Sequence, residues 1–191
     1  MPRDIPVGNG QMLVTFDQKY QIRDVYFPHV GQENHAGLQP CRFGVWSPLP
    51  NSQQNNDDRR KHRLYWSDQG WDIHLGYQPD TLATHVKMHH PKLLLELRCT
   101  DVVDFHHPVL VRRIQVHNLS DQDRQVHLFH HNDFNMYGSK VGDTAYFDPQ
   151  LRSLVHYRTN RYLMATWFAQ GEPRIDEYAT GNAGFHGAEG T

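Results

Sequence analysis

The polar side chains best suited to chemistry lie in one short stretch, Ile22–His35. The stretch reads as a strand that ends at Phe27-Pro28, because proline has no N–H to donate to a β-ladder. A turn at Val30-Gly31 then leads into a polar run with no apolar side chain to bury. A polar loop held on a rigid strand is a common place for binding residues, and a solvated turn between two strands is the alternative. The candidate site residues are Arg23, Asp24, Tyr26, His29, Gln32, Glu33, Asn34 and His35.

The fifteen histidines raise the question of a metal site. Three doublets occur, at His89-His90, His106-His107 and His130-His131. Neighbouring side chains on a strand point to opposite faces, so a doublet cannot present both rings to one ion without a bulge. The sequence also lacks the His-Glu-x-x-His and Cys-x-x-Cys spacings that are typical of zinc sites. We therefore expect no metal and interpret these residues as surface or hydrogen-bonded interior histidines.

Other familiar chemistries lack their residues. There is no Gly-x-Ser-x-Gly sequence for a nucleophilic serine. Gly8-Asn9-Gly10 is too short to hold a phosphate, and no helix is expected after it, so we expect no cofactor. Cys41 and Cys99 lack metal-ligand spacing and are expected to be reduced thiols. Because the first residues also contain no apolar signal segment, a cytoplasmic location is predicted.

The elements that position these residues are predicted to be strands. Apolar runs of four to nine residues alternate with turn residues at a spacing of roughly 8–12 residues, which indicates an all-β sandwich or barrel. In Leu93–Thr100, leucines 93, 95 and 97 share one face, which is typical of a half-buried strand. The predicted strands are Met12–Phe16, Tyr20–Phe27, Phe43–Trp46, Trp71–Tyr77, Leu82–Met88, Leu93–Thr100, Val109–His117, Gln125–His131, Ser153–Tyr157 and Tyr162–Phe168.

Turn residues between neighbouring strands predict how two pairs of them are connected. Asp17-Gln18-Lys19 predicts a hairpin between Met12–Phe16 and Tyr20–Phe27, and Arg158–Arg161 predicts another near the end of the chain. The segment Asn51–Lys61 is polar throughout and has no periodicity, so we interpret it as a long exposed loop inserted in a single domain of residues 1–191.

Composition excludes several classes of function. The formal net charge is -2, so no basic field indicates nucleic acid or an anionic membrane surface as a partner. No apolar run approaches the roughly 18 residues of a membrane span. Aromatic residues make up 12% of the chain, and such rings pack cores or stack on the C–H faces of sugars.

Several motifs together resemble the amino-terminal β-domain of bacterial and archaeal glucoamylase-type enzymes, glycoside hydrolase family 15. The most specific block is Ile22–His35, which contains Arg23-Asp24 and Tyr26–His35. The resemblance covers nearly the whole chain in the same order. Its other parts are Gly8-Asn9-Gly10, Phe43-Gly44-Val45-Trp46, Val111-Arg112-Arg113, His130-His131-Asn132-Asp133-Phe134, Gly142-Asp143-Thr144-Ala145, His156-Tyr157-Arg158 and Gly184–Thr191.

The resemblance implies a large antiparallel two-sheet β-sandwich, the supersandwich of galactose-mutarotase-like proteins. In the resembling enzymes an (α/α)6 catalytic barrel follows this domain. The matched region stops before the domain's last strands, so we expect this chain to be a truncated piece without the barrel.

The resemblance also sets the expectation for catalysis. The resembling enzymes invert the anomeric centre with two carboxyl groups about 6.5–9.5 Å apart, and both groups belong to the barrel. Asp24 with Glu33, or Asp104 with Asp133, are conceivable substitute pairs, but their spacing places neither pair around one substrate. We therefore expect no catalytic residue in this chain.

Two functions remain. In the first, the chain is an accessory domain whose partners are the barrel and an α-glucan oligosaccharide, and the loop helps to shape the substrate entrance or fastens the two domains. In the second, it is a stand-alone sugar-binding or mutarotase-like sandwich, which requires a His/Glu acid–base pair on a concave sheet face.

Overall fold

A computed structural model of the protein describes residues 4–37, 39–50, 62–139 and 141–181. Within these ranges the chain forms strands and one 3-10 helix, with no α-helix, and every strand pairing is antiparallel. The all-β prediction is confirmed, and the arrangement is consistent with a β-sandwich. The predicted insertion at Asn51–Lys61 and the motif Gly184–Thr191 lie outside the described residues.

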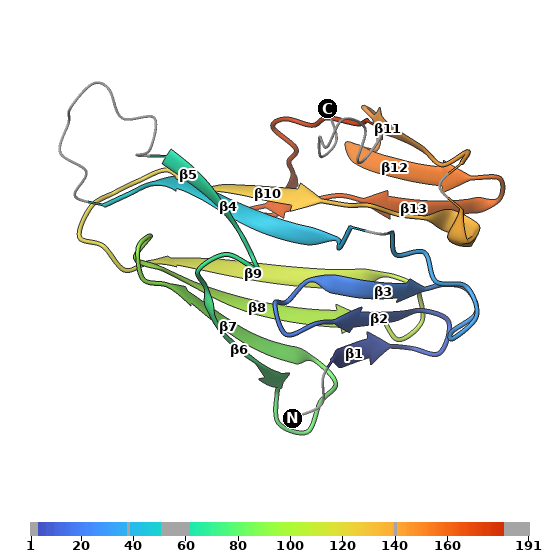
Figure 1. The fold of residues 1–191 in the computed structure, drawn as a ribbon, viewed down its shortest axis with the longest axis horizontal. Helices are drawn as coiled ribbons and strands as arrows, with labels where there is room; N and C mark the ends of the chain where they lie inside the picture. Colours follow the sequence, from blue (N-terminus) through green and yellow to red (C-terminus); the bar gives the residue numbers. More distant parts are fainter. Residues whose placement is uncertain (1–3, 38, 51–61, 140, 182–191) are drawn as a thin grey trace.

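The strands form several short sheets, which Figure 1 shows. The first sheet has the order β1-β2-β3, the second β10-β4-β5, the third β6-β7-β8-β9, the fourth β11-β12-β13 and the fifth β14-β15. The bounds are β1 Ile5–Gly8, β2 Leu13–Phe16, β3 Ile22–Tyr26, β4 Arg42–Pro48, β5 His62–Trp66, β6 Asp72–Tyr77, β7 Thr84–His90, β8 Leu95–Val103, β9 Leu110–Asn118, β10 His127–His131, η1 Met136–Gly138, β11 Thr144–Asp148, β12 Ser153–Arg158, β13 Arg161–Ala165, β14 Phe168–Ala169 and β15 Glu172–Pro173.

Both predicted hairpins are present, as β2–β3 and β12–β13. Four strands, β1, β5, β11 and β15, were not predicted. Strand β1 contains Pro6, which is tolerated because β1 is an edge strand. Strands β9 and β10 follow each other in sequence but pair with β8 and β4 respectively, so the polar segment between them crosses from one sheet to another.

The main core lies between β1–β4 on one side and β7–β8 on the other. Strand alternation produces it, because every second residue of a half-buried strand points inward. On β8, Leu95 and Leu97 are fully buried, whereas Arg98 is exposed. The buried members are Val7, Met12, Val14, Phe16, Tyr20, Val25, Phe43, Val45, Val86, Met88, Leu93, Leu95, Leu97 and Cys99.

A buried ion pair crosses this core. Asp101 of β8 is fully buried, and its Oδ1 accepts a hydrogen bond of 2.6 Å from Nε of Arg112 on β9. Its Oδ2 accepts from the hydroxyls of Tyr20, at 2.5 Å, and Thr84, at 2.7 Å. Burial holds the pKa of Tyr20 well above its ordinary value, which keeps that phenol protonated as a donor. The carboxylate is thereby provided with donors from three separate elements.

The turn between β1 and β2 is tied to the distant loop between β8 and β9 by Asn9. The Oδ1 atom of Asn9 accepts from the backbone N–H groups of Gln11 and Met12. Its Nδ2 donates to the carbonyl oxygens of Asp104, at 2.7 Å, and His107, at 3.0 Å. Through Asn9, the Gly8-Asn9-Gly10 motif therefore hydrogen-bonds the β1-β2-β3 sheet to the β6-β7-β8-β9 sheet.

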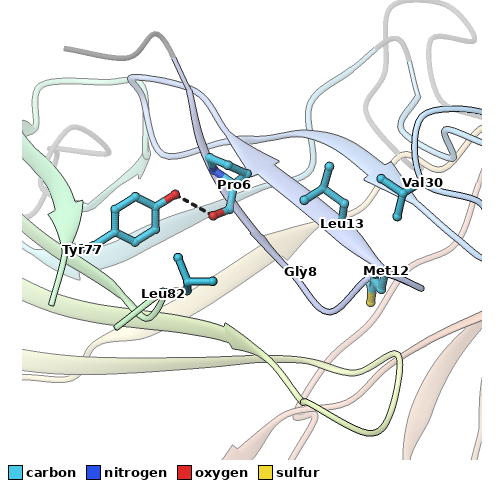
Figure 2. A pocket seen from close by; sticks show the side chains of 8 residues that line it. Pro6, Gly8, Met12, Leu13, Val30, Tyr77 and Leu82 are labelled. Atoms are coloured by element: carbon cyan, nitrogen blue, oxygen red, sulfur yellow. Dashed lines mark hydrogen bonds between the residues drawn. The ribbon is translucent and has the colours of Figure 1, made fainter. Parts of the chain in front are cut away.

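A shallow hollow of about 280 Å³ lies beside this turn, between the β1–β2 hairpin and the end of β6. Figure 2 shows its mainly apolar lining and the hydrogen bond of 2.7 Å from the Tyr77 hydroxyl to the carbonyl oxygen of Pro6. The lining residues are Pro6, Gly8, Gly10, Met12, Leu13, Val30, Tyr77 and Leu82.

Candidate functional site

The candidate loop, residues 27–35, is a compact turn closed by its own backbone. Strand β3 ends at Tyr26, as the proline at position 28 predicted, and Asn34 returns to form a bridge with Tyr26. The N–H of Phe27 donates to the carbonyl oxygen of Glu33, and the N–H groups of Gln32 and Glu33 both donate to the carbonyl oxygen of His29. Gly31 has a φ of +80°, a conformation that glycine adopts without steric cost.

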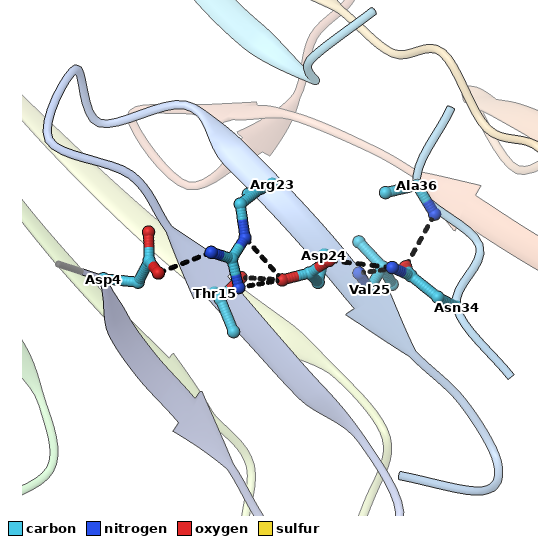
Figure 3. Close-up of polar contacts among 7 residues, drawn as sticks. All are labelled: Asp4, Thr15, Arg23, Asp24, Val25, Asn34 and Ala36. Carbon is cyan, nitrogen blue, oxygen red and sulfur yellow. Dashed lines mark hydrogen bonds and ion pairs between the residues drawn. The ribbon is translucent and has the colours of Figure 1, made fainter. Parts of the chain in front are cut away.

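Asn34 fixes the base of this loop (Figure 3). Its Oδ1 accepts hydrogen bonds from the N–H groups of Val25, at 3.1 Å, and Ala36, at 3.0 Å. Its Nδ2 donates to Oδ1 of Asp24 at 2.8 Å. The amide of Asn34 is thus used internally, which favours a structural role for it over contact with a ligand.

Asp24 is the centre of the same network. Its Oδ2 accepts from the hydroxyl of Thr15 and from Nε of Arg23, both at 2.7 Å, and Arg23 also pairs with Asp4. Burial acts to raise the pKa of Asp24, but the bonds from Thr15, Arg23 and Asn34 outweigh it and lower that pKa. The carboxyl is therefore held as an ionised acceptor.

His35 anchors the end of the loop in the interior. It is fully buried, its N–H donates to Val25 at 2.7 Å, and its Nε2 lies 2.5 Å from the carbonyl oxygen of Phe27. Its own carbonyl accepts from the N–H of Asn135 at 2.9 Å. His35 therefore joins β3 to the segment that precedes η1.

Glu33 connects the loop to the β11-β12-β13 sheet. Its two carboxylate oxygens accept from Nε and Nη2 of Arg161 at 2.9 and 3.0 Å, and Nε2 of His29 lies 3.8 Å from Oε1. The paired donors of Arg161 lower the pKa of Glu33. Sequence reasoning missed Arg161, because a partner 128 positions away leaves no local pattern.

The structure therefore brings most of the predicted residues together, and the side chains of a few others have no hydrogen-bond partner among the described residues. Arg23, Asp24 and Asn34 form one network, and His29 lies near Glu33. Within the described chain, no hydrogen bond involves the side chains of Tyr26 or Gln32. The outward surface of the loop consists of His29, Val30, Gly31 and Gln32.

The carboxyl groups near the loop are not arranged as a general acid and its partner. A general acid at neutral pH needs a raised pKa, whereas those of Asp24 and Glu33 are lowered. The pKa of Asp104 is also lowered, by hydrogen bonds from the His107 side chain and from the N–H groups of His106 and His107. Asp133 accepts instead from the N–H of Gln39 on another element.

One carboxyl close to the loop does have a raised pKa. Burial raises that of Asp143, whose Oδ2 accepts from the N–H of Met136 and whose Oδ1 lies 3.8 Å from Nη1 of Arg158. The candidate loop meets the η1 and β11–β12 region here, and we call this contact the junction. Four buried side-chain atoms of the junction have no hydrogen-bond partner: His35 Nδ1, Asn135 Oδ1, Asp143 Oδ1 and His156 Nε2. These orphaned atoms make the junction polar inside, which suits ordered water.

The histidine doublets do not converge on a common centre. His130-His131 lies on β10 within a predicted strand, and His89-His90 lies on β7, beyond the predicted strand end at Met88. In both doublets the neighbouring rings point to opposite faces. His106-His107 lies in the β8–β9 loop, where the alternation argument does not apply. In the described part of the chain, no group of three or more His, Cys, Asp or Glu side chains is arranged to hold a metal ion.

Comparisons with known proteins relate the chain to one named activity. It is 24% identical over 176 residues, 92% of its length, to an uncharacterized glycosyl hydrolase of Methanocaldococcus jannaschii. The alignment covers 25% of that protein, so the chain spans about a quarter of its relative's length. No protein-family model and no solved structure matches the chain significantly. Among the described residues, no helix has the length and apolarity to cross a membrane.

Proposed function

We propose that the chain is the accessory β-domain of a glucoamylase-type glycoside hydrolase that acts on α-linked glucosyl oligosaccharides. In this proposal residues 1–191 belong to one β-sandwich domain, which packs on an (α/α)6 catalytic barrel. The observation that carries it is the alignment, in which almost the whole chain matches only a quarter of a protein named as a glycosyl hydrolase. Such a ratio is expected when one domain of a larger enzyme is compared with the whole.

The state of the carboxyl groups supports an accessory role. Asp24 and Glu33 lie in the most specific block of the family resemblance, yet each is committed to hydrogen bonds with side chains of the same chain. Their lowered pKa values suit ionised structural acceptors. Bond cleavage would then depend on carboxyl groups outside this chain.

The loop has a defined place in this proposal. Its base is rigid because Asn34 and His35 are bound internally, so its outer residues are held at fixed positions. His29 and Gln32 present exposed polar side chains from that rigid base. They would border the substrate entrance or contact the barrel. The ion pair between Glu33 and Arg161 holds the loop that carries them at a fixed position relative to β13.

The test compares the chain alone with the protein extended by the coding sequence that follows Thr191. Glucose release from maltotriose is measured for both. We expect none from the chain alone and turnover from the extended protein, and deletion of residues 1–191 from the latter should lower its activity. An extended protein that hydrolyses no glycoside, or a chain that releases glucose by itself, would refute the proposal.

The stand-alone mutarotase-like function has one structural feature to consider. The outward face of the β6-β7-β8-β9 sheet aligns Asp72, His89, Glu96 and His117 across its four strands. However, Glu96 pairs with Lys87 at 2.9 Å and Arg98 at 2.8 Å, and both cations lower its pKa. A carboxylate stabilised in this way is a weak general base, so the accessory function is favoured.

A further inference from the structure

The β11-β12-β13 sheet has two faces of different character. On one face, His156 packs against Phe134 with ring centroids 4.8 Å apart, and Arg158 donates to the carbonyl of Met136. Arg161 on that face binds Glu33. This face is therefore attached to the rest of the described chain, and the side chains that alternate with these residues along each strand form the opposite face.

The opposite face carries one tyrosine from each strand, and we call it the tyrosine face. Register places Tyr146 of β11, Tyr157 of β12 and Tyr162 of β13 on the same side of the sheet, with Met164 beside them. Tyr146, Tyr162 and Met164 remain 43%, 60% and 59% exposed. Tyr157 contacts both of the other rings, and the side chains surround Val155, which is only 6% exposed. The exposed rings form an aromatic patch, which commonly marks a binding surface.

The ring geometry suits a flat ligand. The rings of Tyr157 and Tyr162 are nearly parallel, with an interplanar angle of 13° and centroids 5.7 Å apart. Tyr146 meets Tyr157 edge-on at 6.0 Å. Because the two rings are stacked on each other, the ring face of Tyr162 that is turned away from Tyr157 is left open on the edge strand β13. The C–H face of a pyranose ring can lie on that open face.

The polar groups of the face favour a neutral, hydroxyl-rich ligand. In the described chain, no hydrogen bond engages the hydroxyls of Tyr146, Tyr157 or Tyr162. Among the described residues that share this face, there is no lysine, arginine or histidine to attract an anion. Asp148 at its edge uses Oδ1 to accept from the N–H groups of Gln150 and Leu151. A covering protein surface would have to provide partners for all three hydroxyls, whereas a sugar brings its own.

We propose that the tyrosine face binds a neutral α-glucan oligosaccharide, with the open ring face of Tyr162 as the stacking surface and Tyr157 packed behind it. The assignment deepens the proposed function and rests on it for the identity of the sugar. It places the oligosaccharide on the side of the β11-β12-β13 sheet opposite the candidate loop's contact, so the site is distinct from the 27–35 loop.

The test is titration of the 191-residue chain with maltoheptaose, followed by calorimetry and by amide chemical shifts. We expect saturable binding that perturbs residues of β11–β13 and weakens at least tenfold in Tyr162→Ala. Tyr162→Phe keeps the ring and should weaken binding only a few-fold. The matched control is Tyr178→Ala, because Tyr178 is an exposed tyrosine that stacks on Phe147, which faces the other side of the sheet.

Several results would overturn the assignment. They are an absence of binding, shifts confined to other strands, or equal effects of Tyr162→Ala and Tyr178→Ala. Shielding of the three rings by the remainder of a longer protein, with no effect of maltoheptaose, would identify a polypeptide interface instead. Each of these results leaves the accessory function intact if the extended protein still releases glucose from maltotriose, so the two proposals fail separately.

Discussion

The carboxylate of Glu33 and the guanidinium of Arg161 form a two-bond ion pair that joins the 27–35 loop to β13. The two residues are 128 positions apart, and both side chains are only about one-fifth exposed, at 22% and 18%. The planar fork of arginine matches both oxygens of a carboxylate, which gives such a pair directional specificity. The loop is consequently positioned by a sheet that follows it by more than a hundred residues.

Replacing Glu33 with Gln should lower the melting temperature by a few degrees, because one charge-assisted bond is lost. The double variant Glu33→Arg, Arg161→Glu should recover part of the loss. Glu172→Gln, at an exposed acid, is the control. The pair also predicts pH dependence. The pKa of Glu33 is lowered in the folded state, so its contribution is present above the ordinary value of 4.5 and is lost as the pH falls below it. An unchanged melting temperature in Glu33→Gln would contradict this role.

Replacing Asn34 with Ala should destabilise the protein by about 1–3 kcal/mol, because two backbone N–H groups and the Asp24 carboxylate each lose a partner. Urea denaturation measures the change. Gln32→Ala is the matched control in the same loop, since the Gln32 side chain is exposed. If Asn34→Ala unfolds at the same urea concentration as the unsubstituted protein, its hydrogen bonds do not fix the loop.

Removing one partner of the buried pair between Asp101 and Arg112 should cost about 3–5 kcal/mol, because the other charge is left in the core. The double variant Asp101→Leu, Arg112→Met should be less destabilised than the sum of the two single variants. Denaturant titration of all four proteins gives the coupling energy. Arg113→Met, on the exposed face of the same strand, should change the free energy of unfolding by less than about 0.5 kcal/mol. Strict additivity would mean that the pair is not coupled.

The two thiols should be unreactive in the folded protein. Cys41 and Cys99 are free and buried, and burial raises the pKa of each to about 12. The thiolate is the reactive form, so a thiol reagent at pH 8 should label both cysteines only after denaturant is added. Fast labelling of either cysteine without denaturant would show that the core opens locally.

Most of the strands were predictable from local pattern, whereas the polar contacts between them were not. Leu95, Leu97 and Arg98 occupy the faces that alternation predicts. The same alternation places Asp101 on the inward face with Leu95, which was an available signal for the buried pair. Strand β5 was missed because it follows the polar segment 51–61, and its pairing with β4 is not local. The end of β3 and the turn after it were predictable from Pro28 and Gly31, but the partner Arg161 depends on the tertiary arrangement of β13.

Three histidines, one fully buried and two partly buried, predict a second pH dependence, at a higher pH than that of Glu33. Burial lowers the pKa of His130 to about 3, with Arg112 contributing, and lowers those of His90 and His156 to about 4. The hydrogen bond from the N–H of Leu93 to Nδ1 of His90 also requires an unprotonated nitrogen there. In the folded state all three rings are therefore neutral at pH 5.

The sign follows from proton counting. Below the ordinary histidine value of 6.5, the unfolded chain binds protons on these rings and the folded chain does not, so stability falls as the pH falls. Three such groups give a slope of at most about 4 kcal/mol per pH unit, which ends once the folded rings titrate near pH 3–4. Urea denaturation at pH 7, 6 and 5 measures this slope before most carboxyl groups titrate.

His130→Phe, whose ring can keep the contacts with Phe43 and Trp167, should remove about one-third of the pH slope of stability. His106→Gln, in the β8–β9 loop, should leave it unchanged. A stability that is constant from pH 7 to 5, or equal slopes in His130→Phe and the unsubstituted protein, would show that His130 is not neutral and buried in the folded state.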